Sequence, residues 1–198
     1  MANGNTSFGY LLPTREVVMA AGDPDFASII DLVETADGLG FDSVWCGDSV
    51  LARPRLEALS TLAAIAGRTQ QVKLGTAVFL PALRNPVVLA NEVANLDIIS
   101  KGRVILGVGI ASKTPSVEKE FNACGVSFRH RVSIFEECIT LMRRLWTEPE
   151  VTFNGQHFQM EGISLGLQPV QKGGVPIWMA ASAEKPQRRM LKIGDGWF

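Results

Sequence analysis

Some side chains that could bind or transform a ligand follow short apolar runs of this chain. Arg53, Arg55 and Arg84 lie after two such runs, and guanidinium groups bind the anionic groups of a substrate or cofactor tail. Surface solvation is the alternative role for at least one of them. Gly107-Val108-Gly109 begins like a dinucleotide-binding loop, but Ser112 stands where the third glycine would be, which argues against that loop.

Metal-binding patterns are missing from the sequence. His130 and His157 do not have the spacing of metal ligands, and neither an HExxH motif nor a Walker-type loop occurs. Cys46, Cys124 and Cys138 form no CxxC pair, and an odd count at wide spacing indicates a reducing compartment. We therefore expect no metal and a cytoplasmic location.

Strand and helix units must position these residues. The β-branched run at residues 72–79 is followed by a helical pattern that opens at Asn85-Pro86, and then by a second run at residues 104–108. This spacing predicts a βαβ unit with two parallel strands and a right-handed crossover. Ligands bind at the carboxyl ends of such strands, so we expect the site at residues 77–85 and 109–113.

The same unit recurs along the chain. Strand-like runs begin near Phe8, Asp42, Val72, Val104 and Val175, with a stub at residues 196–198. Helical patterns lie between them, and Asn154-Gly155 predicts a β-hairpin after the fourth helix, in an excursion over residues 149–172. Repeats of this length are typical of a (β/α)8 barrel or a doubly wound open sheet.

Composition limits the partners. The chain is 46% hydrophobic and 20% charged with a net charge of −1, which is ordinary for a globular domain and gives no electrostatic case for nucleic acid or an anionic membrane. The N-terminus has no secretory pattern, and no apolar run reaches the roughly 18 residues that could span a bilayer. We expect a small-molecule substrate, with neither a nucleic-acid nor a membrane partner.

The length suggests an incomplete barrel. A complete one needs roughly 250 residues, whereas this chain has 198 residues and five strand-like runs with a stub. We therefore expect an α/β chain of (β/α)8 TIM-barrel type, with residues 1–198 as one C-terminally truncated domain of five to six strands. Open sheet edges can pair with another chain, so we also expect a homo-oligomer.

Short motifs follow one another along nearly the whole chain. They include Gly40-Phe41-Asp42, Leu74-Gly75-Thr76, Arg84-Asn85-Pro86, Leu106-Gly107-Val108-Gly109, Glu120-Phe121, Phe153-Asn154-Gly155 and Gly194-Asp195-Gly196-Trp197-Phe198. Together and in this order, they resemble the N-terminal two-thirds of the luciferase-like flavin-dependent oxidoreductases, which include bacterial luciferase and deazaflavin-dependent enzymes. Members of that family are (β/α)8 barrels with an excursion after the fourth helix.

The resemblance implies a flavin-type ring at the carboxyl end of the barrel. A non-prolyl cis peptide at Ala77-Val78, next to Thr76, would lie against the ring. The cofactor phosphate would lie near two turns with small side chains, one of them at a helix N-terminus whose dipole favours anions. These turns comprise Gly109, Ile110, Ala111 and Ser112, and Ala180, Ala181 and Ser182. Ser182 could also serve as an ordinary helix N-cap.

The resemblance also points to the end of the second strand. Many family members have a histidine directly after an aspartate there, whereas this chain has Asp48 and then Ser49. We take this pair as the candidate catalytic positions, with Asp48 contacting the ring or substrate, or else acting as a turn aspartate. Cys46 would face either the core or the site.

The resemblance finally implies an enzyme. The leading interpretation is a luciferase-like monooxygenase that acts on a small organic substrate with reduced FMN and oxygen. The alternatives are a hydride-transfer oxidoreductase that uses the deazaflavin coenzyme F420, and a flavin-binding fragment without catalysis. A phosphate-binding barrel isomerase or aldolase is less favoured, because no lysine is placed at a strand end for a Schiff base.

Overall fold

The computed structural model describes residues 6–198. The first five residues, which belong to the N-terminal segment and to the domain proposed from the sequence, lie outside the described residues. The elements follow in the order β1 (Gly9–Leu11), α1 (Glu16–Met19), α2 (Phe26–Gly38), β2 (Ser43–Cys46), α3 (Ala58–Ala66), β3 (Lys73–Thr76), η1 (Pro81–Leu83), α4 (Pro86–Ile99), β4 (Val104–Val108), α5 (Pro115–Ala123), η2 (Phe128–His130), α6 (Arg131–Thr147), β5 (Val151–Asn154), β6 (Gln159–Ile163), β7 (Ile177–Met179), α7 (Glu184–Ile193) and β8 (Gly196–Trp197).

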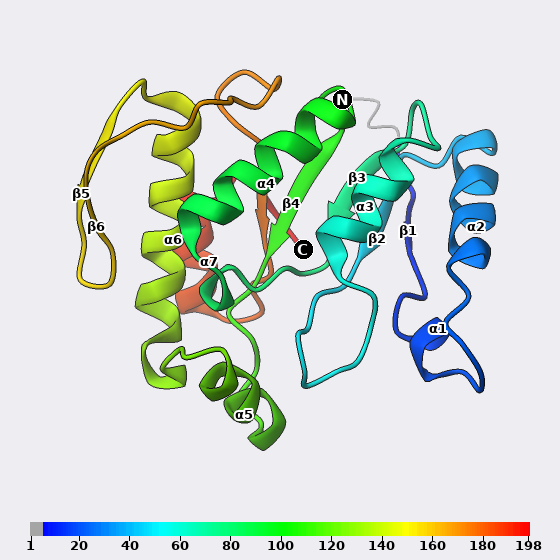
Figure 1. Ribbon diagram of the computed structural model, residues 1–198, viewed down its shortest axis with the longest axis horizontal. Helices are drawn as coiled ribbons and strands as arrows, with labels where there is room; N and C mark the ends of the chain where they lie inside the picture. The colour runs from blue at the N-terminus through cyan, green and yellow to red at the C-terminus, as the bar shows by residue number, and fades with distance from the viewer. Residues whose placement is uncertain (1–5) are drawn as a thin grey trace.

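The main sheet is parallel and curled. It has six strands in the order β1-β2-β3-β4-β7-β8, and every neighbouring pair is parallel. Leu74 pairs with Val104, so the predicted βαβ unit is confirmed. Helices α2, α3, α4 and α6 lie outside the sheet (Figure 1). This arrangement confirms the expected incomplete barrel of (β/α)8 type.

Alternate strand residues face the helices and form the core. Val44, Leu74 and Leu106 are fully buried there, which is the period-two pattern of a strand. Cys46 belongs to the same core and, two residues after Val44, faces the helices. This burial raises the pKa of its thiol to about 12 and keeps the thiol protonated. This buried thiol behaves as a small apolar side chain.

The other face of the sheet combines aromatic rings with glycines. Trp45, Trp178 and Phe198 have ring centroids 5.1–5.8 Å apart. The rings have room because glycines stand opposite them: a Cβ on Gly75 would lie 2.1 Å from the Trp45 ring. A Cβ on Gly107 would lie 1.9 Å from the Thr76 carbonyl oxygen and 2.7 Å from the Phe198 ring.

Gly107→Ala is expected to lower the free energy of unfolding by about 1–3 kcal/mol, because overpacking against a backbone oxygen forces the two strands apart. Urea unfolding followed by circular dichroism measures the change. Gly38→Ala is the matched control, since a Cβ there meets no atom within 4 Å at the end of α2. Equal stability of the two variants would contradict the close approach of β3 and β4.

The β5–β6 hairpin forms within the predicted excursion, but its turn is longer than an Asn-Gly turn. Asn154 still pairs with Gln159, so residues 155–158 form the loop. The Glu137 carboxylate on α6 accepts the backbone N–H groups of Gln156, His157 and Phe158 at 2.8–3.1 Å. This tertiary anchor sets the loop conformation and lies 18 residues or more away in the sequence, outside the range of a local turn signal.

Several element boundaries differ from the sequence expectations. The predicted strand run over 72–79 pairs regularly only as far as Thr76, and the last helix begins at Glu184 with Ala183 as its N-cap. The N-cap role considered for Ser182 is therefore wrong. The short α1 was not predicted. No helix within residues 6–198 is both long and apolar enough to cross a bilayer.

Candidate functional site

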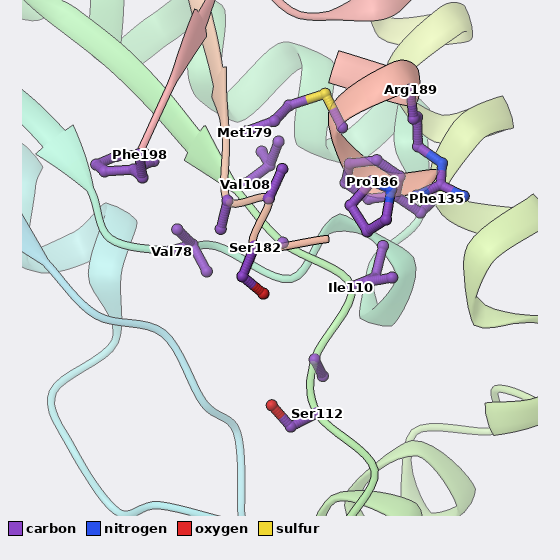
Figure 2. A pocket seen from close by; sticks show the side chains of 14 residues that line it. Val78, Val108, Ile110, Ser112, Phe135, Met179, Ser182, Pro186, Arg189 and Phe198 are labelled. Atoms are coloured by element: carbon purple, nitrogen blue, oxygen red, sulfur yellow. The ribbon is translucent and has the colours of Figure 1, made fainter. Parts of the chain in front are cut away.

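A cavity of about 420 Å³ opens at the carboxyl ends of β4 and β7 (Figure 2). The turns after these two strands form much of its wall, and both turns were predicted as parts of the cofactor site. The predicted residues that line it are Val78, Gly109, Ile110, Ala111, Ser112, Ala180, Ala181 and Ser182. Parallel strands bring their carboxyl ends to one edge of the sheet, which is why two turns about 70 residues apart meet here.

The wall of this cavity suits a flat ring with an attached phosphate. The Ala77-Val78 peptide bond is cis, as the resemblance implied. A Cβ on Gly109 would lie 2.7 Å from Val78 Cγ2, so only glycine lets these two segments approach this closely. Ala111 has a φ of 61°, which is a left-handed backbone conformation. Residues other than glycine, asparagine and aspartate seldom adopt it, and it is often found at functional sites.

Backbone donors are available in both turns. Within residues 6–198, no protein acceptor is bonded to the N–H groups of Ile110, Ala111, Ser112, Ala181 or Ser182. The Ser182 and Ser112 hydroxyls lie along the same wall (Figure 2). Unpaired N–H groups and hydroxyls of this kind are the usual ligands of a phosphate at a helix N-terminus. The wall therefore fits the phosphate of a flavin-type cofactor.

Thr76 is the exception among the predicted cofactor residues. Its side chain is buried, and the residue is only 1% exposed. The hydroxyl donates to the Gly107 carbonyl oxygen at 2.7 Å. Thr76 therefore joins β3 to β4 and is not among the residues that line the cavity, and its role in cofactor binding stays a prediction.

A second cavity of about 210 Å³ adjoins the first. The two share Val78, Ala111 and Ser112, so the cis peptide lies at their junction. Asp48 and Ser49 line the second cavity, and so does Ala77. All the predicted site residues except Thr76 thus line one continuous hollow at one edge of the sheet.

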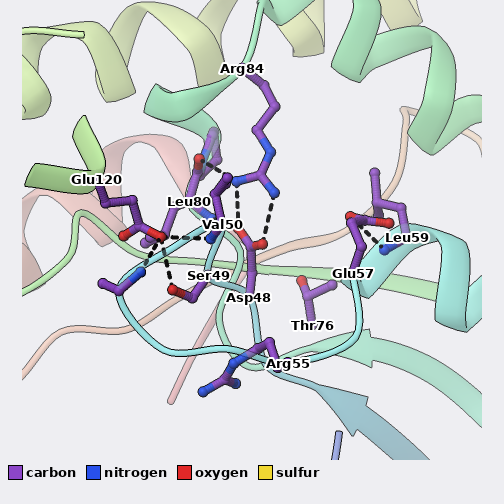
Figure 3. Close-up of polar contacts among 12 residues, drawn as sticks. Asp48, Ser49, Val50, Arg55, Glu57, Leu59, Thr76, Leu80, Arg84 and Glu120 are labelled. Carbon is purple, nitrogen blue, oxygen red and sulfur yellow. Dashed lines mark hydrogen bonds and ion pairs between the residues drawn. The ribbon is translucent and has the colours of Figure 1, made fainter. Parts of the chain in front are cut away.

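Asp48 is held by Arg84. The guanidinium donates to Oδ2 at 2.6 Å and to Oδ1 at 2.7 Å, and the Leu80 N–H donates to Oδ2 at 3.0 Å (Figure 3). The Asp48 side chain is 1% exposed, and burial raises its pKa while Arg84 and the Leu80 N–H act in the opposite direction. These bonds tie the end of β2 to the segment that follows Val78.

Ser49 is held by Glu120, a residue to which the sequence analysis gave no individual role. Its hydroxyl donates to Glu120 Oε1 at 2.8 Å, and the same oxygen accepts the N–H groups of Val50, Leu51 and Ala52 at 2.6–3.2 Å (Figure 3). Burial opposes ionisation of Glu120, but these donors together lower its pKa. The Glu120-Phe121 motif, part of the family resemblance, was the available signal for this role.

The histidines lie elsewhere. His130 and His157 line a separate hollow beside the hairpin, with ring centroids 5.7 Å apart, and His157 Nε2 lies 2.8 Å from the Ser133 hydroxyl. Within residues 6–198, no group of three or more His, Cys, Asp or Glu side chains is placed to hold a metal ion.

Comparisons with known proteins show what this chain is similar to. The chain matches the luciferase-like monooxygenase family over residues 6–198. It is 35% identical over 178 residues to an F420-dependent glucose-6-phosphate dehydrogenase from Intrasporangium calvum. That match covers 85% of this chain and 52% of the relative, so the chain spans about half the length of the curated relatives that it matches.

Solved structures share the fold. Monooxygenase RslO1 from Streptomyces bottropensis superposes with a TM-score of 0.79 at 30% identity, covering 89% of this chain and 54% of that one. An F420-dependent secondary alcohol dehydrogenase, solved with an F420-acetone adduct, has a TM-score of 0.80 at 24% identity and covers 98% of this chain and 58% of its own. The similar structures include complexes with FMN as well as with F420.

Proposed function

Because this chain belongs to the luciferase-like monooxygenase family, we propose that it forms the cofactor-binding part of an oxidoreductase that acts on a small organic substrate. The observation that carries the proposal is the pair of cavities at the carboxyl ends of the parallel strands, which share Val78, Ala111 and Ser112 in their walls. One cavity has the turns that would hold the cofactor phosphate, and the other would take a substrate beside the ring. We also propose that residues 1–198 act as one barrel domain with its excursion at residues 149–172.

Different residues of the two cavities would support the ring and hold the phosphate. Ala77 and Val78 would support the ring, and the turns at residues 109–112 and 180–182 would hold the phosphate through backbone N–H groups and hydroxyls. A bound flavin or deazaflavin supplies the redox chemistry, and the protein orients it and keeps water out. Asp48 and Glu120 support this arrangement by holding residues 48–52 in place.

Oxygenation with reduced FMN is the first candidate reaction. Both carboxylates of the described lining, those of Asp48 and Glu120, are engaged by donors of the protein, and Ser49 donates to Glu120. These groups therefore suit positioning better than proton transfer, and hydride transfer from an alcohol would need a base for the hydroxyl proton. F420-dependent hydride transfer is the second candidate, favoured by the 35% identical dehydrogenase.

Titration with each cofactor tests the proposal. We expect FMN or F420 to bind with quenching of its fluorescence, and Gly109→Val to weaken binding at least tenfold because its side chain would fill the space next to Val78. Oxygen consumption with reduced FMN supports the first reaction, and F420 reduction by an alcohol or sugar phosphate supports the second. If neither cofactor binds, the proposal is wrong.

Two further expectations stay predictions. Light scattering on the purified chain measures whether it forms the homo-oligomer predicted from open sheet edges, and cell fractionation measures the cytoplasmic location. Neither result bears on the choice of cofactor.

A further inference from the structure

We propose that Arg55, assisted by Arg53 and Arg15, forms a subsite for an anionic group of the substrate in the second cavity. The inference rests on the proposed function and narrows its substrate class to small organic molecules that carry a phosphate, sulfonate or carboxylate group. Arg53 and Arg55 line this cavity, on the side of the cis peptide opposite the predicted phosphate turns.

The sequence alone could not separate Arg55 from Arg84, and the structure does. Arg84 is neutralised by the two bonds to Asp48, and its guanidinium lies 4.2 Å from the centre of the Phe79 ring. Arg55, by contrast, forms no ion pair with any carboxylate of residues 6–198. Among the residues that the structure describes, the Arg55 guanidinium makes one hydrogen bond, a long one of 3.4 Å from Nε to the Arg53 carbonyl oxygen.

Two carboxylates near Arg55, those of Asp48 and Glu57, are already engaged by other donors. Asp48 is saturated by Arg84 and Leu80, and in Figure 3 no dashed line joins it to Arg55. Glu57 caps α3 by accepting the N–H groups of Leu59 and Ser60 at 3.0 and 2.7 Å. The half-buried Arg55 guanidinium thus carries a positive charge that no neighbouring side chain neutralises by contact.

Arg55 also lies next to the predicted ring site. A Cβ built on Gly47 would stand 1.7 Å from Arg55 Nη1 and 3.6 Å from the Ala77 carbonyl oxygen. Only a glycine at the end of β2 leaves room for the guanidinium beside the cis peptide. An anion bound by Arg55 would therefore hold the rest of a small substrate within reach of the ring.

Further positive charge surrounds this position. The Leu56 N–H donates to the Thr14 carbonyl oxygen at 3.0 Å, which brings the Arg15 segment beside Arg55. Burial lowers the pKa of Arg55, and repulsion from Arg15 and Arg53 lowers it further, against the opposing influence of Asp48 and Glu16. Adjacent cations in a cavity are costly without a counterion, and a bound anion relieves their repulsion.

Anion titration of the full chain tests the subsite. Inorganic phosphate, methanesulfonate and acetate are titrated separately by calorimetry into the wild type, Arg55→Gln and the control Arg68→Gln. Arg68 pairs with Glu34 at the surface, away from the cavity. We expect at least one anion to bind, and its affinity to fall about tenfold in Arg55→Gln only, as for loss of a charge-assisted contact. The anion that binds most tightly identifies the substrate class.

Three results would overturn the subsite: no anion binds the wild type, Arg55→Gln binds as tightly as the wild type, or both variants weaken binding equally. Urea unfolding of Arg55→Gln checks that the variant is folded. FMN and F420 titrations of the same proteins separate the two proposals. If anions bind through Arg55 but neither cofactor binds, the subsite proposal stands and the proposed flavin-dependent function is rejected. If a cofactor binds but no anion does, the proposed function stands and the subsite is rejected.

Discussion

Arg84→Ala is expected to lower the free energy of unfolding by about 3–5 kcal/mol, because removing one partner of a buried ion pair leaves the other charge without compensation. The Asp48 side chain is 1% exposed and would keep only the Leu80 N–H as a partner. The loss should be smaller in acid. Burial already raises the folded-state pKa of Asp48, and without Arg84 this pKa rises further, so the neutral acid forms readily as the pH falls.

Urea unfolding at several pH values measures this effect. Arg68→Ala is the matched control, because the Arg68–Glu34 pair is 59% and 39% exposed and should contribute less than about 1 kcal/mol. The double variant Asp48→Asn with Arg84→Met removes both charges and should be more stable than Arg84→Ala alone. A cost no larger than that of Arg68→Ala would show that the Asp48–Arg84 pair does not hold the site.

Glu120→Ala should have the next largest effect, about 2–4 kcal/mol, because one carboxylate oxygen accepts the Ser49 hydroxyl and three backbone N–H groups. Residues 49–52 would lose their anchor to α5, and two of them, Ser49 and Ala52, line the second cavity. We therefore expect weaker substrate binding as well as lower stability. Urea unfolding and substrate KM measure the two effects separately.

The pH dependence of stability distinguishes the Glu120 charge from simple packing. The folded-state pKa of Glu120 is lowered, so its contribution is present above the unfolded value of about 4.3 and is lost as the pH falls through the folded value. Glu120→Gln should thus be less stable than the wild type at neutral pH, with the gap closing in acid. Glu118→Gln on the same helix is the control, and an identical pH profile for both variants would argue against the anchor.

These two carboxylates serve a common purpose. Asp48 joins the end of β2 to the segment after β3, and Glu120 joins the following loop to α5. Each carboxylate accepts backbone N–H groups of a loop that has no regular secondary structure to supply carbonyl acceptors. Such acceptors are needed because buried N–H groups are costly when they are left without a hydrogen bond. A site on loops can be kept rigid in this way while its inner wall stays open for ligands.

The sequence by itself determined the βα repeat and the edge of the sheet at which we expect a ligand to bind. Apolar runs such as residues 104–108 and the Asn85-Pro86 start of α4 are local signals, and parallel strands must present their carboxyl ends together. The βα prediction succeeded because it depends on residues close together in the chain and on the handedness of the βα unit. The ordered motifs added the cis Ala77-Val78 bond, which the structure contains, and the cofactor turns, which stay a prediction.

Only the tertiary structure decided which polar side chains remain free for chemistry. Asp48 meets Arg84 across 36 residues, and Ser49 meets Glu120 across 71 residues, so no local pattern shows these bonds. The Asp48–Arg84 pair separates neutralised Arg84 from unpaired Arg55, and a bond to the Gly107 carbonyl oxygen holds the Thr76 hydroxyl between β3 and β4. The physical reason is that a charge is neutralised by whatever partner lies within a few ångströms, and only the folded chain sets those distances.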